Sequence, residues 1–203
     1  MEDGASDLAR TLRSKVACTR GHFLYESGHH GDVWLDLNDL FVDARAVQRW
    51  ARELARRAEG AQAQVVCGPM TGGAFLALAL AAELGLDFVF AEQLQDESDE
   101  VRYRVPQSLR ARLRGRPLLL VDDVVNAGSA WSATMSDVLE CGATVAGFAT
   151  LMTMGEAARE IAARHGAPLY SLAALERRMW APETCPLCRE GVPLSFGLLR
   201  PML

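Results

Sequence analysis

Short apolar segments alternate with amphipathic segments between residues 44 and 172, and this alternation leaves few possible folds. Helical spacing of apolar residues predicts helices over residues 44–58, 73–84, 129–141 and 156–165. Strands are predicted over residues 64–67, 88–91, 117–121, 144–152 and 168–172. Strands that alternate with helices form a parallel sheet with helices on both faces. We therefore expect an α/β fold with a mostly parallel central sheet flanked by helices.

Composition excludes several classes of protein. The chain has 203 residues, which suits one domain with a sizeable core. No apolar run reaches the length of a membrane span, and the acidic N-terminus shows no secretory signal. The net charge of −5 argues against nucleic-acid or anionic-membrane binding. Five cysteines without an export signal predict reduced thiols and a cytoplasmic protein.

One motif joins a buried strand to a helix through a small polar turn. Residues 118–130 read LLLVDDVVNAGSA. The turn presents backbone N–H groups and hydroxyls at a helix N-terminus, which suits a phosphate. Asp122 and Asp123 precede the turn and could accept hydrogen bonds from sugar hydroxyls. The motif therefore predicts a site for a phosphorylated ribose. The alternative is an ordinary strand–turn–helix corner with two acids at the strand end.

A second candidate phosphate loop follows another predicted strand. Residues 67–74 read CGPMTGGA, and their glycines allow the backbone to approach an anion closely. The loop is neither a Walker loop nor a Gly-x-Gly-x-x-Gly dinucleotide turn. Both loops should lie at the carboxyl edge of the sheet, where ligands bind in such folds. The alternative is a helix entry with glycines for packing.

Three segments resemble a known family. Residues 118–130 resemble the 5-phosphoribosyl-1-pyrophosphate (PRPP) signature of type I phosphoribosyltransferases, most closely its orotate phosphoribosyltransferase form. Residues 21–36 resemble the N-terminal segment of that form, and residues 180–193 resemble tails in one bacterial branch of it. The resemblance implies a single domain over residues 1–203. Its core would span about 44–175, under a small hood from about 20–40, with 176–203 as a second candidate segment.

The resemblance also implies an activity and its residues. The enzyme would transfer phosphoribose from PRPP to orotate, giving orotidine 5'-monophosphate and pyrophosphate in pyrimidine biosynthesis. Magnesium would be bound through PRPP, and the protein would be a homodimer. PRPP would contact Asp122, Asp123, Val124, Val125, Asn126, Ala127, Gly128, Ser129 and Ala130. Pyrophosphate would contact Met70, Thr71, Gly72 and Gly73, with a cis peptide between Met70 and Thr71. The base would lie near Phe23 and Trp34.

The chain departs from the family pattern at three places. The loop over residues 91–104 lacks the usual Lys and His, so Arg102 and Arg104 are the candidate catalytic cations beside Asp122 and Asp123. The two arginines could instead form one solvated face of an edge strand. An orotate-binding Asp-Arg pair is missing from residues 151–156, and Glu26 stands where Lys is common. A different base, or a PRPP- or nucleotide-binding regulator without catalysis, therefore remains an alternative.

Histidines and cysteines form a last group of candidates. We expect His22, His29 and His30 to be solvated in a polar loop, with a metal site as the alternative. Cys185 and Cys188 have the spacing of half a structural zinc site, but no second Cys-x-x-Cys exists. A dimer partner, or Cys18 and a histidine, could complete it. The favoured interpretation is a tight turn with two buried thiols.

Overall fold

The computed structural model describes residues 2–25, 27–94 and 102–195, and side chains from residue 8 onward. Its described residues form a six-stranded sheet, in the order β5-β4-β3-β6-β7-β8, and a three-stranded sheet, β1-β2-β9. The strands are β1 (Ala17–Leu24), β2 (His30–Asp36), β3 (Val65–Pro69), β4 (Asp87–Leu94), β5 (Arg102–Arg104), β6 (Pro117–Val125), β7 (Thr144–Met154), β8 (Leu169–Leu175) and β9 (Met179–Trp180). The helices are α1 (Glu2–Ser14), η1 (Asn38–Leu40), α2 (Ala44–Arg57), α3 (Gly72–Leu84), α4 (Gln107–Arg110), α5 (Ser129–Glu140), α6 (Ala157–Arg164), η2 (Pro182–Thr184) and α7 (Pro186–Arg189).

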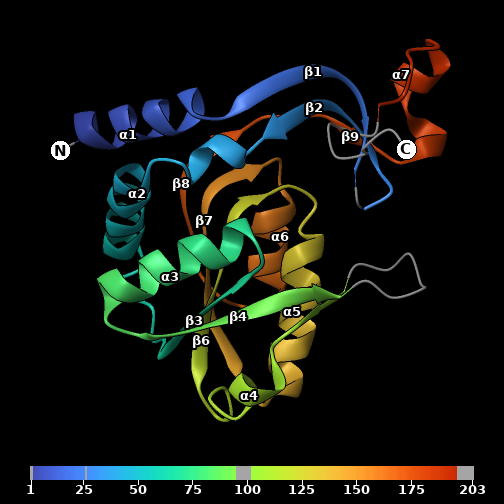
Figure 1. Ribbon diagram of the computed structural model, residues 1–203. Coiled ribbons are helices and arrows are strands. Elements are labelled where there is room, and N and C mark those ends of the chain that lie inside the picture. Colours follow the sequence, from blue (N-terminus) through green and yellow to red (C-terminus); the bar gives the residue numbers. More distant parts are fainter. Residues whose placement is uncertain (1, 26, 95–101, 196–203) are drawn as a thin grey trace.

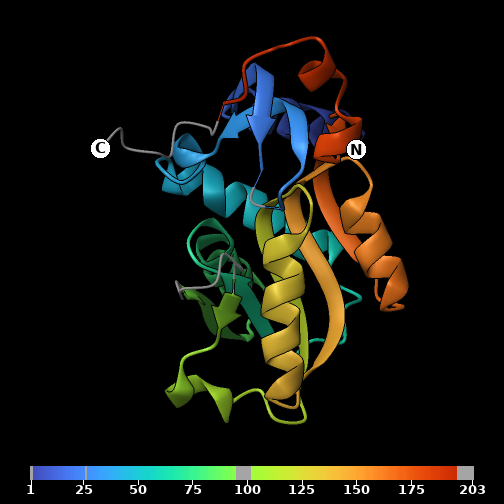
Figure 2. The same cartoon turned by 90° about the vertical axis from the view of Figure 1, so that its right-hand side faces the viewer.

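The six-stranded sheet is parallel except at one edge, where β5 pairs antiparallel with β4. Its two faces bury separate sets of side chains because successive residues of a strand point in opposite directions. Leu119 and Val121 of β6 pack with α2 and α3, whereas Leu118 and Leu120 pack with α5 and α6. Figures 1 and 2 show these helices on opposite faces. The expected α/β architecture is confirmed. None of the described helices has the length and apolar character that a bilayer crossing requires.

Strand β6 is longer than the sequence pattern predicts. We expected it to end at Val121, but it continues to Val125. Pairing with β7 explains the difference, because Asp122 pairs with Thr150 and the register continues to Val125. The two acids therefore belong to the sheet itself, and their backbone positions are fixed by a neighbouring strand.

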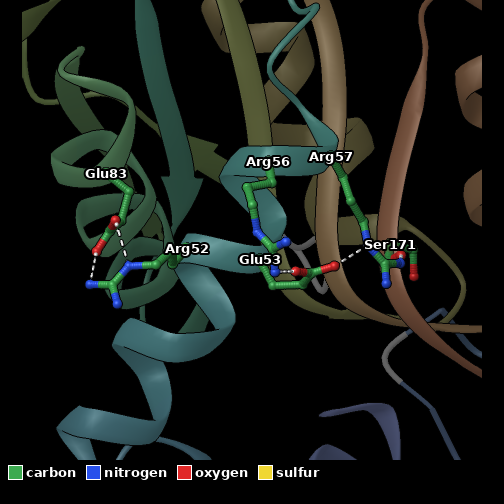
Figure 3. A network of polar contacts seen from close by, with 6 residues as sticks. All are labelled: Arg52, Glu53, Arg56, Arg57, Glu83 and Ser171. Atoms are coloured by element: carbon green, nitrogen blue, oxygen red, sulfur yellow. Dashed lines mark hydrogen bonds and ion pairs between the residues drawn. The ribbon is translucent and has the colours of Figure 1, made fainter. Parts of the chain in front are cut away.

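Polar contacts fix the position of α2 against its neighbours. Arg52 donates to Glu83 of α3, with its Nε 3.3 Å from Oε2 (Figure 3). Arg57 donates to the carbonyl oxygen of Ser171 in β8, while its Nε lies 3.1 Å from Glu53 Oε1. Exposed ion pairs contribute little stability each, so the buried side chains of α2 carry most of its packing energy.

A small hood, comprising β1, β2, β9, η2 and α7, lies above the end of the large sheet where β7 terminates (Figure 1). His30 and Gly31 of β2 pair with β9, and the backbone N–H of Ser195 donates to His22 O at 2.7 Å. Asp32 accepts hydrogen bonds from the backbone N and Nε of Arg178, at 2.9 and 3.1 Å. Residues of both segments thus pair with each other in this small sheet. Residues 196–203 lie outside the described part of the chain.

The expectation of solvated histidines is wrong for two of the three. His22 and His30 are 2% and 7% exposed, because α7 packs over the hairpin that carries them. His29 is half-buried and faces the carbonyl oxygen of Ser27. Of the two thiols expected to be buried, Cys185 is buried and Cys188 is exposed.

Candidate functional site

The turn after β6 leads directly into α5. Gly128 has a φ of +79°, a left-handed conformation that strains other residues, and a Cβ there would also displace Ile161 Cδ1, 2.3 Å away. Among the residues that the structure describes, no side chain caps the N-terminus of α5. The first N–H groups of this helix therefore lack a side-chain acceptor, and they form a place where an anion can bind.

Asp122 and Asp123 lie just before this turn. Asp122 Oδ1 accepts the backbone N–H of Asp123 at 3.0 Å, and Asp123 Oδ1 accepts that of Val124 at 2.7 Å. Asp122 is buried and Asp123 is partly buried. Burial raises the pKa of Asp123, and its hydrogen bonds oppose this increase. The carboxylates are thus held in place in an environment that would favour a nearby cation or hydrogen-bond donor.

The loop over residues 70–73 packs directly against these acids. A Cβ on Gly72 would stand 2.0 Å from Asp123 Oδ2, and one on Gly73 would stand 2.6 Å from Asp122 Oδ1. The expected cis peptide between Met70 and Thr71 is present. The structure therefore brings together the two loops that the sequence predicts as phosphate sites, and only glycine leaves room for the contact.

A cavity of about 340 Å³ opens between the hood and the β6–α5 turn. Its lining includes Tyr25, Ser27, Val33, Trp34, Leu35, Asp36, Leu37, Asn38, Asp122, Val124, Val125, Asn126, Ala127, Gly128, Ser129, Ala130 and Met154. Ser27 Oγ and Asn126 Oδ1 are buried and have no hydrogen-bond partner within the described residues. Buried polar atoms are nearly always paired, so these two are suited to a ligand.

The two aromatic residues predicted to contact a base have different positions. Trp34 lines the cavity, whereas Phe23 does not. Phe23 is buried and packs against Trp34, with ring centroids 5.9 Å apart. A ligand in the cavity would contact Trp34, and Phe23 would support the Trp34 ring from behind.

Arg102 and Arg104 do not join the acids within this chain. They lie on β5, exposed on either side of buried Tyr103, which is the alternation of an edge strand. Arg104 Nε is 3.6 Å from Asp137 Oδ1, and both arginines line a separate cavity. Part of the expected catalytic loop, residues 95–101, lies outside the described residues. Glu26 also lies outside them.

The sequence interpretation missed Arg177, which follows β8. Its Nη2 donates to Asn126 O at 3.1 Å, and its Cζ lies 5.8 Å from the centre of the Tyr25 ring. Burial lowers the pKa of this guanidinium, and its Nε has no hydrogen-bond partner among the described residues. A basic residue just after a strand that ends at the ligand edge was the available signal.

Comparison with known proteins identifies the family. The family model described as phosphoribosyl transferase domain matches residues 36–165. The chain belongs to the phosphoribosyltransferase family. An orotate phosphoribosyltransferase of Caldanaerobacter subterraneus subsp. tengcongensis is 32% identical over 175 residues, which cover 86% of this chain and 87% of the relative. That of Carboxydothermus hydrogenoformans is 30% identical and covers 93% and 94%.

Solved phosphoribosyltransferases share the fold. The crystal structure of orotate phosphoribosyltransferase from Aeropyrum pernix has a TM-score of 0.64 and 26% identity, and the match covers 83% of this chain and 93% of that one. Adenine phosphoribosyltransferase from Thermoanaerobacter pseudethanolicus has the same TM-score at 17% identity, covering 82% and 99%. Because the fold serves more than one base, the choice of base must be argued from the site.

In this phosphoribosyltransferase, Arg177 lies beside the segment that lacks the Asp-Arg pair expected from the resemblance. Residues 154–156 read Met-Gly-Glu. A Cβ on Gly155 would stand 3.9 Å from Arg177 Cζ. The guanidinium of Arg177, from the segment after β8, therefore lies beside Gly155.

Proposed function

We propose that this protein transfers phosphoribose from PRPP to a pyrimidine base, with orotate as the base. The observation that carries the proposal is the contact between the two loops at Asp122 and Asp123, next to a cavity under the hood. Relatives named orotate phosphoribosyltransferase, which match most of the chain, support it. So does the fold of Mycobacterium tuberculosis orotate phosphoribosyltransferase in complex with PRPP, which is 19% identical with a TM-score of 0.60.

In the proposed arrangement, each group of PRPP contacts a different part of the site. The 5-phosphate would accept hydrogen bonds from the turn over residues 126–130, and the ribose hydroxyls would donate to Asp122 and Asp123. Pyrophosphate would lie on residues 70–73. The bond from ribose C1 to pyrophosphate breaks, and pyrophosphate leaves with the electron pair. A ring nitrogen of the base then forms the new bond to C1, and the proton of that nitrogen passes to the departing pyrophosphate. Catalysis would rest on positioning and charge stabilisation.

Magnesium fits the residues of this site. Carboxylate oxygens are its preferred protein ligands, and it is commonly bound together with substrate phosphates. Asp122 and Asp123 supply such oxygens, and the raised pKa of Asp123 reflects a carboxylate that a cation would stabilise. Bound with PRPP, magnesium would neutralise charge on the pyrophosphate. The chain's own contribution is to hold the two carboxylates and the two loops in a fixed relation.

The base would lie in the cavity against Trp34. Arg177 packs behind two lining residues, Tyr25 and Asn126, and from there its guanidinium would reach a carboxylate of the base. Arginine binds carboxylates through charge-assisted hydrogen bonds, often in pairs. Its unpartnered Nε and its place beside Gly155 support this role. We therefore favour orotate over a base without a carboxylate.

Replacing Arg177 with Gln tests the base assignment. Kinetics of the full chain with orotate and with uracil, the same ring without the carboxylate, should separate charge recognition from general damage. We expect kcat/KM for orotate to fall about 10- to 100-fold, because a charge-assisted hydrogen bond contributes roughly 1.5–3 kcal/mol. Any activity with uracil should change little. Arg159→Gln removes an exposed ion pair with Glu156 and serves as the matched control. Equal losses for both bases would contradict the assignment.

A regulator that binds PRPP without catalysis is the second candidate. The position of Arg102 and Arg104, away from the acids, favours it because no other cation of the usual catalytic loop is available. A turnover assay with PRPP, magnesium and a panel of bases separates the two functions. Release of pyrophosphate with any base supports the enzyme. Tight binding of PRPP without release of pyrophosphate, for every base tried, would support the regulator instead.

We also propose a homodimer that uses an apolar patch on and beside α3. Val42, Met70, Phe75 and Leu78 are 80%, 39%, 48% and 54% exposed. Phe75 and Leu78 are three residues apart on α3 and so share a face of the helix. Large exposed apolar residues that gather in one patch mark an interaction surface. The double variant Phe75→Glu with Leu78→Glu should give a monomer by light scattering, whereas an unchanged mass would exclude this surface.

A further inference from the structure

Four potential metal ligands converge inside the hood. His22 lies in β1, His30 begins β2, Cys185 precedes α7 and Cys188 lies within it. Their ligand atoms all lie within 4.8 Å of one another. His22, His30 and Cys185 are buried and Cys188 is exposed. Figures 1 and 2 show α7 beside the strands that carry the histidines.

The distances between these atoms match the edges of a small tetrahedron. His22 Nε2 and His30 Nδ1 are 3.0 Å apart. Cys185 Sγ lies 3.4 Å from His22 Nε2, and Cys188 Sγ lies 3.7 Å from the same atom and 3.2 Å from His30 Nδ1. Tetrahedral zinc, with bonds of about 2.0–2.1 Å to nitrogen and 2.3 Å to sulfur, places its ligand atoms about 3.3–3.8 Å apart. The four distances given above differ from these values by at most about 0.5 Å, and all four ligand atoms lie within 4.8 Å of one another.

Hydrogen bonds satisfy this cluster less completely than a cation would. His22 Nδ1 lies 2.8 Å from Val192 O, a carbonyl that can only accept, so Nδ1 carries the proton. In the neutral form of this ring, Nε2 holds one lone pair in the ring plane, and His30 Nδ1 and both sulfurs approach it. One lone pair can serve one of three such neighbours. A cation placed among the four atoms would satisfy all of them.

We propose that these four residues bind a structural zinc ion. Thiolate and imidazole are the ligands that zinc prefers, and Cys-x-x-Cys with two histidines is a common structural set. The carbonyl oxygen of Val192 fixes the ring of His22, as outer-shell partners of metal-bound histidines do. Four protein ligands leave no open coordination position, so the ion is structural and not catalytic.

The ion would join the segment over residues 179–195 to the β1–β2 hairpin. Without it, the backbone of that segment contacts the hairpin through the two-residue strand β9, through Ser195 and through the bond from His22 Nδ1 to Val192 O. The same hairpin carries Tyr25 and Trp34 into the wall of the cavity. Zinc would therefore support the cavity wall from outside, without contacting a substrate.

Metal analysis of the purified full chain tests the proposal, with any affinity tag removed. We expect about one zinc per chain by mass spectrometry, and less than a tenth of that in Cys185→Ser with Cys188→Ser. Cys18→Ser and His29→Asn are matched controls, because Cys18 is exposed and His29 is not among the four ligands. Both controls should retain the metal. A strong chelator should lower the Tm of the wild type and leave that of the double variant unchanged.

Cobalt keeps the test decisive if the cysteine variants do not fold. Wild-type protein exchanged with Co²⁺ should show visible bands of tetrahedral cobalt and a sulfur-to-cobalt charge-transfer band. Absence of zinc and of these bands after reconstitution would overturn the proposal. So would a disulfide between Cys185 and Cys188 in protein purified under reducing conditions, or equal loss of metal in the Cys18→Ser control.

Discussion

Gly72→Ala should disrupt the PRPP site by a clash that the structure locates at one atom. The added Cβ would stand 2.0 Å from Asp123 Oδ2, which is more than about 1 Å closer than van der Waals contact allows. Neither α3 nor β6 can retreat easily, because both belong to the buried core. The Asp123 side chain must therefore rotate and give up the 2.7 Å hydrogen bond from Val124 N. Losing that bond costs about 1–3 kcal/mol.

Calorimetric titration with magnesium and PRPP measures the consequence. We expect Kd to rise roughly 10- to 100-fold and Tm to fall by ~3–10 °C. Gly60→Ala is the matched control, because no atom lies within 4 Å of its Cβ and its φ is ordinary. Wild-type affinity and Tm in Gly72→Ala would refute the contact between this loop and the acid.

Three further predictions concern single side chains. Burial raises the pKa of Asp123 above its ordinary 3.8. Between the pKa of the unfolded chain and the higher pKa of the folded protein, the folded state binds more protons, so its stability falls as the pH rises through that window. Asp123→Asn should therefore raise the Tm of ligand-free protein at pH 7 while removing PRPP binding, and a lower Tm would contradict this. Asp137→Ala removes the carboxylate that accepts the Val105 N–H at 2.8 Å. Urea melts should show that the free energy of unfolding falls by about 2–4 kcal/mol, and a fall below about 0.5 kcal/mol would count against this prediction. Burial raises the pKa of the Cys67 thiol, so at pH 8 a thiol reagent should modify exposed Cys18 and reach Cys67 only on unfolding, as mass spectrometry would show.

The sequence predicted those elements whose structure depends on residues close together in the chain. The core helices and the parallel strands follow from apolar periodicity, and the glycine loops follow from the need for close backbone approach. Where the acids lie was predicted less well. β6 extends through Asp122 because β7 pairs with it, and no pattern within residues 117–125 contains that partner.

The hood was the least predictable part because its contacts join distant segments. His22 meets Cys185 across 163 positions of the chain, and Arg177 meets Asn126 across 51. Each histidine taken alone suggests a solvated loop residue, and the Cys-x-x-Cys pair suggests half of a site. The pairing of β2 with β9, together with the contacts between the thiols and the histidines, shows that the two belong together.

That pairing also sets an order of assembly during synthesis. All strands of the large sheet lie between residues 65 and 175, so a ribosome releases them before β9 emerges. Folding of the sheet can then precede closure of the hood, which is a contact of high sequence separation. The pocket that we assign to the base thus acquires its outer support late in translation. A nascent chain stopped before residue 179 would hold the phosphate loops in place but lack the strand and the thiols that support Trp34.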